Sequence, residues 1–213
     1  MDNWFIRVFS SSIGKKLVMA ITGLFFCLFL ILHLIDNMMV YKGKIAFDKY
    51  VNSLHTFPLL ISVIEIGLML FALLHIGFGL YLFYQNQKAT AVKYSIRKWA
   101  GGRTLSSSLM PYTGLYILVF IVVHLVNFRF AIEEGKSIYN MMNIAFSSPL
   151  YVAFYTLSMM IVALHIRHGF WSAFQTLGLN HPKYMHFIQK VSTLFAVVVA
   201  ISMASVPIYL FLI

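Results

Sequence analysis

The sequence predicts an all-α integral membrane protein built as a bundle of five transmembrane helices. Of its 213 residues, 61% are hydrophobic and only 10% are charged, whereas about a quarter of the residues in a soluble domain are charged. The mean hydropathy is +0.84. Apolar stretches long enough to cross a bilayer, which takes about 20 residues, recur five times along the chain. We therefore expect a single membrane domain over residues 1–213 with no sizeable soluble part.

The five expected spans are residues 17–40, 58–84, 109–130, 149–174 and 187–213. The first exceeds the apolar core of a signal peptide and lacks a small-residue cleavage site, so it is expected to remain as a helix. A proline stands at the start of each of the next three, where its missing N–H costs nothing: Pro58, Pro111 and Pro149. Pro182 lies just before the fifth span, and Pro207 falls near its far end.

The distribution of basic residues predicts how the bundle is oriented. The net charge is +10, but the lysines and arginines sit in short loops beside apolar spans, which indicates a positive-inside signal and not nucleic-acid binding. A basic inner surface also suits anionic membrane lipid or an acidic partner. Three segments place the N terminus in the cytoplasm and the C terminus outside: Arg7 with Lys15 and Lys16, the loop with Lys88, Lys93, Arg97, Lys98 and Arg103, and Lys183 with Lys190. The segment 42–49 departs from this rule, and its Asp48 is expected to be a solvated loop charge.

Two halves of the chain repeat one histidine pattern, and the fifth span has no counterpart. A Thr-Gly dipeptide with a histidine eleven residues after the threonine occurs at Thr22 and His33, and again 91 residues later at Thr113 and His124. A Leu-His-Ile tripeptide with a glycine four residues after the histidine occurs at His75 and Gly79, and again 90 residues later at His165 and Gly169. A histidine inside a bilayer is costly unless it has a partner and a function.

The expected orientation puts the four histidines at two depths. His33 and His124 lie about 15 residues from the inner ends of their helices, or about 22–24 Å at 1.5 Å per residue. His75 and His165 lie a similar distance below the outer ends of helices that run inward, so the two layers are roughly 10 Å apart. A haem iron takes one imidazole on each face. The pattern thus predicts a haem-binding four-helix core with two bis-histidine sites, His33 with His124 and His75 with His165.

Other interpretations of these residues stay open. A single membrane histidine often serves only as a hydrogen bond between helices, although the repeat argues against this for all four. Zinc is poorly supported because Cys27 is the lone cysteine. Gly79 and Gly169 would let a flat macrocycle lie against the backbone, and Thr22 and Thr113 would offer hydroxyls to a haem edge. Ordinary helix packing is the alternative explanation for these small residues, and for the threonines it is at least as good.

Five helices, a histidine in each of the first four and a basic inner face resemble the di-haem cytochrome b subunit of succinate:quinone oxidoreductases. More narrowly, the chain is similar to the single-subunit anchors of bacterial menaquinol:fumarate reductases and their succinate dehydrogenase relatives. The resemblance covers nearly the whole chain, and its specific part is the order and spacing of the histidines. It implies that His33 and His124 hold the distal haem b and that His75 and His165 hold the proximal one.

The resemblance also implies partners and a location. A flavoprotein subunit, where the dicarboxylate chemistry occurs, and an iron–sulfur subunit would dock on the cytoplasmic face of a bacterial inner membrane, and this chain would exchange electrons with menaquinone. Some members of the family carry a glutamate two residues before the helix-four ligand for transmembrane proton transfer. Here that position is Ala163, which puts such a proton route in doubt.

Two charged residues are candidates for roles near these sites. Quinol oxidation releases protons, so a titratable group is expected near the outer haem. Glu65 is the carboxylate that lies well within the second span, level with His33. We expect it either to transfer protons to or from the quinone or to make a hydrogen bond to a neighbouring helix. Arg167, at the inner end beside His165, would pair with a haem propionate.

Two further functions remain as alternatives. One is the cytochrome b subunit of another quinone-linked enzyme, such as a hydrogenase or formate dehydrogenase. The other is a haem-free membrane transporter or scaffold in which the histidines pack or carry protons.

Overall fold

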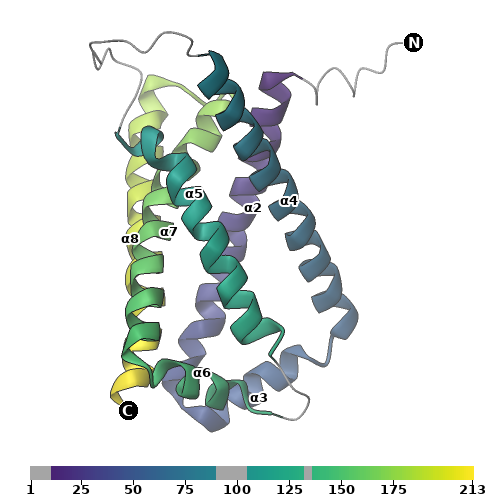
Figure 1. Ribbon diagram of the computed structural model, residues 1–213, viewed down its shortest axis with the longest axis vertical. Coiled ribbons are helices and arrows are strands. Elements are labelled where there is room, and N and C mark those ends of the chain that lie inside the picture. Colours follow the sequence, from purple (N-terminus) through teal and green to yellow (C-terminus); the bar gives the residue numbers. More distant parts are fainter. Residues whose placement is uncertain (1–10, 90–104, 132–135) are drawn as a thin grey trace.

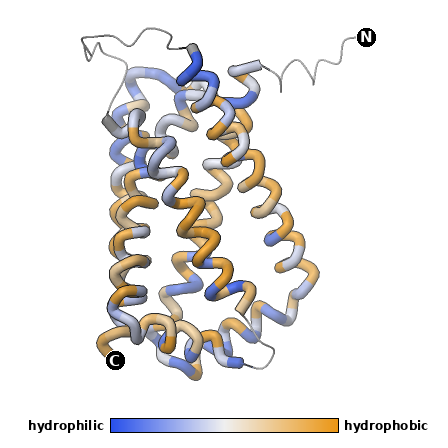
Figure 2. The backbone as a smooth tube through the Cα atoms, in the orientation of Figure 1, coloured by the Kyte–Doolittle hydropathy of each residue, from blue (hydrophilic) through white to orange (hydrophobic). Residues whose placement is uncertain are grey.

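The computed structural model describes residues 11–89, 105–131 and 136–213, and in this part of the chain the protein is a bundle of long helices (Figure 1). The five long helices are α2 (Ser12–Met38), α4 (Pro58–Ala89), α5 (Leu105–His124), α7 (Pro149–Thr176) and α8 (Pro182–Leu212). Each is long and apolar enough to cross a membrane. Figure 2 shows apolar residues along the middle of the helices and polar ones gathered near the ends. The all-α membrane fold predicted from composition is confirmed.

The helices extend beyond the apolar stretches, because backbone hydrogen bonding continues into polar flanking residues. The first helix starts at Ser12, where the hydroxyl of Ser11 accepts a hydrogen bond from the N–H of Gly14 at 2.9 Å. Pro58 and Pro149 begin their helices as predicted, but the assignment of Pro111 to a helix start is wrong, since it lies inside α5. Pro182 is the first residue of α8, not a residue before it.

Two central helices hold the bundle together. Helix α7 packs along α8 and also contacts α2 and α5, while α2 contacts α4, α7 and α8. Buried Val162, Ile166, Ala196 and Val199 form the seam between α7 and α8. Helix α4 packs chiefly against α2. Each histidine-bearing helix therefore has another as its neighbour.

Two short helices close the end of the bundle near the C terminus of α8 (Figure 1). They are α3 (Lys44–Leu54), which follows the 3₁₀ turn η1 (Met39–Lys42), and α6 (Ile138–Phe146). Following the predicted orientation, we call this the outer end, and the end where α2 begins the inner end. A cluster of buried residues lies beneath these helices: Val40, Phe47, Phe120, Tyr139, Met142, Phe146, Tyr155, Val206 and Leu210.

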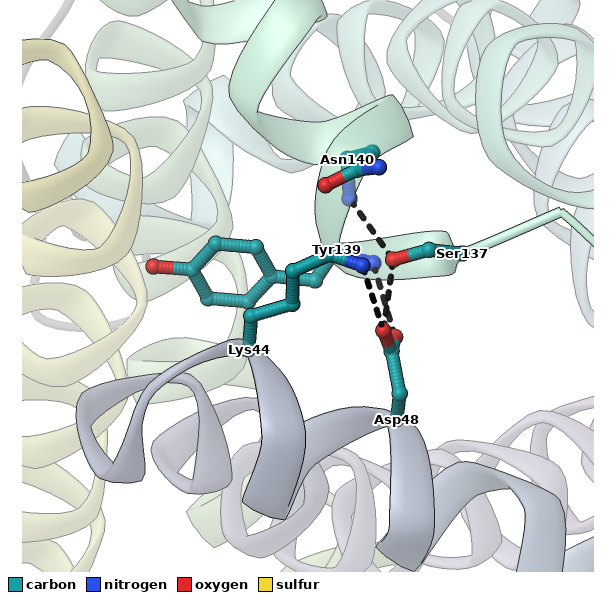
Figure 3. A network of polar contacts seen from close by, with 5 residues as sticks. All are labelled: Lys44, Asp48, Ser137, Tyr139 and Asn140. Carbon is teal, nitrogen blue, oxygen red and sulfur yellow. Dashed lines mark hydrogen bonds and ion pairs between the residues drawn. The ribbon is translucent and has the colours of Figure 1, made fainter.

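Asp48 joins the two short helices, so its expected role as a solvated loop charge is wrong. It lies within α3 and accepts hydrogen bonds from the Ser137 hydroxyl at 2.7 Å, the Lys44 ammonium at 3.3 Å and the Tyr139 N–H at 3.4 Å (Figure 3). Ser137 is also the N-cap of α6, and a carboxylate at a helix N-terminus is favoured by the helix dipole. Desolvation opposes ionisation of Asp48, but these hydrogen bonds outweigh it and keep its pKa below the usual value.

A second bond ties α3 to the end of α2. The hydroxyl of Tyr50 donates a hydrogen bond to the carboxylate of Asp36 at 2.5 Å. This bond, with burial second, raises the pKa of Tyr50 to about 12. The outer end is thus held by polar contacts between elements that are far apart in sequence.

Candidate functional site

The four repeated histidines lie in the bundle as two pairs. The ring centroids of His33 and His124 are 5.9 Å apart, and those of His75 and His165 are 6.5 Å apart. We call His75 and His165 the inner pair and His33 and His124 the outer pair. Each pair joins two different long helices, α2 with α5 and α4 with α7. These are the pairs that helical depth predicts.

In the inner pair, the hydrogen-bonding partners determine which nitrogen carries the proton. His75 Nδ1 lies 3.2 Å from the backbone oxygen of Met19 and 3.1 Å from Thr22 Oγ1. A carbonyl oxygen only accepts, so Nδ1 of His75 is the protonated nitrogen. His165 Nδ1 lies 3.0 Å from Thr113 Oγ1. In His75 the remaining nitrogen, Nε2, is therefore left with a lone pair suited to a metal, and the matching threonine contact of His165 is compatible with the same form.

The glycine of each Thr-Gly dipeptide lets the histidine ring come close. A Cβ atom on Gly23 would stand 3.3 Å from His75 Cε1, and one on Gly114 would stand 3.4 Å from His165 Cε1. The 3.3 Å contact is tighter than nine in ten contacts made by real Cβ atoms, and the 3.4 Å contact lies at the edge of ordinary van der Waals distance. The dipeptides of α2 and α5 therefore hold the histidines of α4 and α7.

The outer pair is held mainly by aromatic rings. Phe29 stacks on His33 with centroids 5.2 Å apart, and Phe120 stacks on His124 at 5.8 Å. His124 Nδ1 is buried and has no hydrogen-bond partner within the described residues. His33 Nε2 lies 3.4 Å from Asn37 Nδ2, which is at the long limit for a hydrogen bond. The same Asn37 nitrogen also donates to the His33 carbonyl at 2.8 Å.

The spacing within both pairs suits a metal held between two imidazoles. Metal–nitrogen bonds of about 2 Å on opposite sides of one ion put the ring centroids roughly 6 Å apart. Within the described segments no third histidine, cysteine or acidic residue joins either pair as a further ligand. Neutral imidazoles taken two at a time are the ligand set of a bis-histidine haem. The residues present therefore fit haem, most completely at the inner pair, where Nδ1 is also satisfied.

Methionines extend the repeat in a way that the sequence analysis missed. A Cβ atom on Gly79 would lie 3.8 Å from the terminal methyl of Met19, and one on Gly169 would lie 3.8 Å from that of Met110. Each methionine precedes its Thr-Gly dipeptide by three residues. The repeated unit is therefore Met-x-x-Thr-Gly on one helix facing His-x-x-x-Gly on the next. The shared 91-residue offset of Met19 and Met110 would have identified it.

Glu65 forms a bidentate ion pair with Arg129. Arg129 Nε and Nη2 donate to the two carboxylate oxygens at 2.6 and 2.8 Å. The arginine is placed by a π-helical turn, η2 (Leu125–Arg129), which follows directly after His124. Glu65 thus bonds the neighbouring transmembrane helix, as in the structural interpretation of this residue.

Other predicted residues lie apart from the histidine pairs. The Arg167 side chain donates to Thr193 Oγ1 on α8 at 3.2 Å, and its carbonyl accepts a hydrogen bond from the Ser192 hydroxyl. Several residues used to predict orientation lie outside the described part of the chain: Arg7, Lys93, Arg97, Lys98 and Arg103.

A search of curated proteins finds one with a related sequence. The succinate dehydrogenase cytochrome b558 subunit of Bacillus subtilis (strain 168) is 25% identical over 181 residues, which cover 84% of this chain and 85% of that protein. No protein-family model matches the chain, and no solved structure matches it.

The match confirms the resemblance inferred from the histidine order and spacing. It runs over most of both proteins, and the five apolar helices agree with a multi-pass membrane subunit. The chain thus resembles a succinate dehydrogenase cytochrome b subunit over most of its length.

Proposed function

We propose that this protein is a di-haem membrane anchor that transfers electrons between menaquinone and the iron–sulfur subunit of a succinate dehydrogenase or fumarate reductase complex. The observation that carries the proposal is the meeting of four repeated histidines in two pairs, with centroid separations of 5.9 and 6.5 Å. The relative named a cytochrome b558 subunit supports haem b as the group they hold.

Each pair would hold one haem b by its two imidazoles. His75 and His165 would bind the proximal haem, and His33 and His124 the distal haem. When bound, haem b supplies a reversible one-electron carrier in a site where the protein tunes the potential through ligands, hydrogen bonds and burial. The protein's own part is to orient the rings, keep Nε2 unprotonated at the inner pair and exclude water from the bundle. Gly79, Gly169, Thr22 and Thr113 belong to these surroundings.

The partner subunits would dock on the inner end. Lys16, Lys183 and Lys190 belong to the basic segments at this end, and the inner pair is the one expected nearer to it. A flavoprotein subunit and an iron–sulfur subunit on the cytoplasmic face of a bacterial inner membrane would then lie next to the proximal haem. Dicarboxylate chemistry belongs to the flavoprotein. Arg167 is proposed to bind a haem propionate after release from Thr193.

Menaquinone would react at the outer end, where the distal haem lies. We propose Glu65 as the group that accepts a quinol proton there. The carboxylate lies beside the turn that follows His124, and because Arg129 occupies both of its oxygens, it would part from Arg129 before it takes up a proton.

The test is the haem content of the purified complex and of two ligand variants. The wild-type complex is expected to hold two haems b per copy of this chain, measured by the pyridine haemochrome spectrum. His33→Ala and His75→Ala should each lose one haem and keep the other, with different bands missing from the reduced-minus-oxidised spectrum. His186→Ala, at an exposed position near the start of α8, is the matched control and should keep both.

The partners separate this proposal from its alternatives. Co-purification of a flavoprotein with an iron–sulfur protein is the expected result, whereas a hydrogenase or formate dehydrogenase partner would reassign the complex. A wild-type protein without b-type bands, or histidine variants that keep both haems, would refute the haem assignment.

A further inference from the structure

Each inner histidine is contacted by a threonine hydroxyl whose own proton is already used. Thr22 Oγ1 lies 2.7 Å from the Val18 carbonyl and 3.2 Å from that of Met19, and both are acceptors only. The single hydroxyl proton therefore goes to the backbone, and toward His75 the oxygen presents a lone pair. The side chain is almost completely buried, with 2% exposed, so water does not compete for this contact.

The second half of the repeat has the same arrangement. Thr113 Oγ1 lies 3.1 Å from the carbonyls of Leu109 and Met110, and it accepts from His165 Nδ1 at 3.0 Å. Two independent copies of one motif thus make the same contact between neighbouring helices. One difference separates them: His75 Nδ1 also has the Met19 carbonyl at 3.2 Å, while among the described residues Thr113 is the acceptor found for His165.

We propose that Thr22 and Thr113 are positioning residues that keep the inner histidines in the Nδ1–H form and thereby lower the reduction potential of the proximal haem. This inference rests on the proposed function. When a metal-binding imidazole donates a hydrogen bond from the nitrogen that does not bind the metal, the bond fixes the ring and raises the basicity of the metal-binding nitrogen. A more basic ligand stabilises oxidised iron relative to reduced iron. Among the described residues no threonine makes such a contact at the outer pair, so the effect is confined to one haem.

The experiment is a redox titration of both haems in the complete membrane complex. Thr113→Val keeps the shape of the side chain and removes the acceptor, so the potential of the proximal haem should rise and that of the distal haem should stay. The expected change is about tenfold in the ratio of reduced to oxidised haem at a fixed ambient potential, or about 59 mV for a one-electron couple. Thr22→Val should give a smaller rise because the Met19 carbonyl remains. Thr113→Ser and Thr22→Ser should restore the wild-type values.

Thr156→Val is the matched control. The hydroxyl oxygen of this threonine in α7 is buried and has no hydrogen-bond partner in the described segments, so both potentials should stay unchanged. Equal potentials in wild type and both valine variants, or an equal shift in Thr156→Val, would overturn the inference. With either of these outcomes, a wild-type complex that contains two haems would still support the proposed function. A wild-type complex without haem would overturn both.

If the valine variants do not assemble, a second pair of variants tests the contact between the Thr-Gly dipeptide and the inner histidine ring. Gly114→Ala should press a methyl group on the His165 ring at about the 3.4 Å separation found for its Cβ and alter the low-spin electron paramagnetic resonance signal of one haem. Gly67→Ala, where a Cβ meets nothing within 4 Å, should leave both signals unchanged. Identical signals in Gly114→Ala and wild type would contradict the proposed ring positioning.

Discussion

The inner and outer histidine pairs come from the same sequence repeat but are held by different forces. Nδ1 of each inner histidine has a threonine partner at 3.0–3.1 Å, and a glycine lies against each ring. The outer rings stack on Phe29 and Phe120, and His124 Nδ1 has no partner in the described residues. The inner pair is thus positioned by directional bonds, and the outer pair by packing.

The difference coincides with a group of elements that gather at the outer end. The cap helices α3 and α6, the π-helical turn η2 and the pair of Glu65 with Arg129 all lie there. Tyr155 stands at the centre of an aromatic cluster that reaches His124 at 6.1 Å. Each half thus places a short helix between its two long ones, α3 between α2 and α4 and α6 between α5 and α7, and both short helices lie at the outer end.

The largest expected effect is a loss of stability at the outer end, which should make the distal haem dissociate at a lower temperature than the proximal one. Phe146 is 3% exposed and packs on Phe128 and Tyr155 at 5.7 and 5.1 Å. Phe146→Ala should lower the free energy of unfolding by about 3–5 kcal/mol, because it removes a buried ring and leaves a cavity. Thermal release of haem from the purified complex should then show the distal haem lost first.

The matched control for this variant is Phe187→Ala, since Phe187 is 68% exposed. It should release both haems at the wild-type temperatures. Simultaneous loss of both haems in Phe146→Ala would show that the two ends are not held separately.

A smaller effect is expected from the ion pair at the outer end. Glu65→Gln, Arg129→Gln and the double variant form a cycle whose coupling energy should be about 1–2 kcal/mol, because the pair is bidentate but partly exposed. Equilibrium unfolding in detergent measures it. If Glu65 also accepts a proton, Glu65→Gln alone should slow quinol oxidation and change its pH profile. If Glu65→Gln and Arg129→Gln oxidise quinol at equal rates, Glu65 has a purely structural role.

The smallest expected effect concerns acid stability of the cap. The lowered pKa of Asp48 means that its ionised form stabilises the folded state fully above the ordinary value of 3.8. This contribution, about 0.5–1 kcal/mol for partly exposed hydrogen bonds, declines as the pH falls from 3.8 through the lower folded-state pKa. Asp48→Asn should remove that pH dependence in unfolding measured between pH 3 and 5, roughly the range of carboxylate titration. Lys49→Gln, an exposed change on the same helix, is the control and should retain it.

The sequence was sufficient to predict the helical bundle and the repeated histidine pattern in its two halves. Membrane helices satisfy their own backbone groups, so apolar length alone identifies them. Pro111 was misplaced because the helix runs one turn beyond the apolar stretch. The cap helices were missed because α3 is short and only weakly apolar, and the bond between Asp48 and Ser137 joins residues 89 positions apart.

By itself, the sequence determined which residues are the candidate haem ligands: the period of the repeat and the rise per residue of a helix place four histidines at two depths. Only the tertiary structure decided what touches them. That Thr22 serves His75 and not the histidine of its own helix depends on how α2 and α4 pack, since side chains meet across helices at distances that sequence spacing does not encode. The Glu65–Arg129 pair likewise depends on the π-helical turn that brings Arg129 to α4.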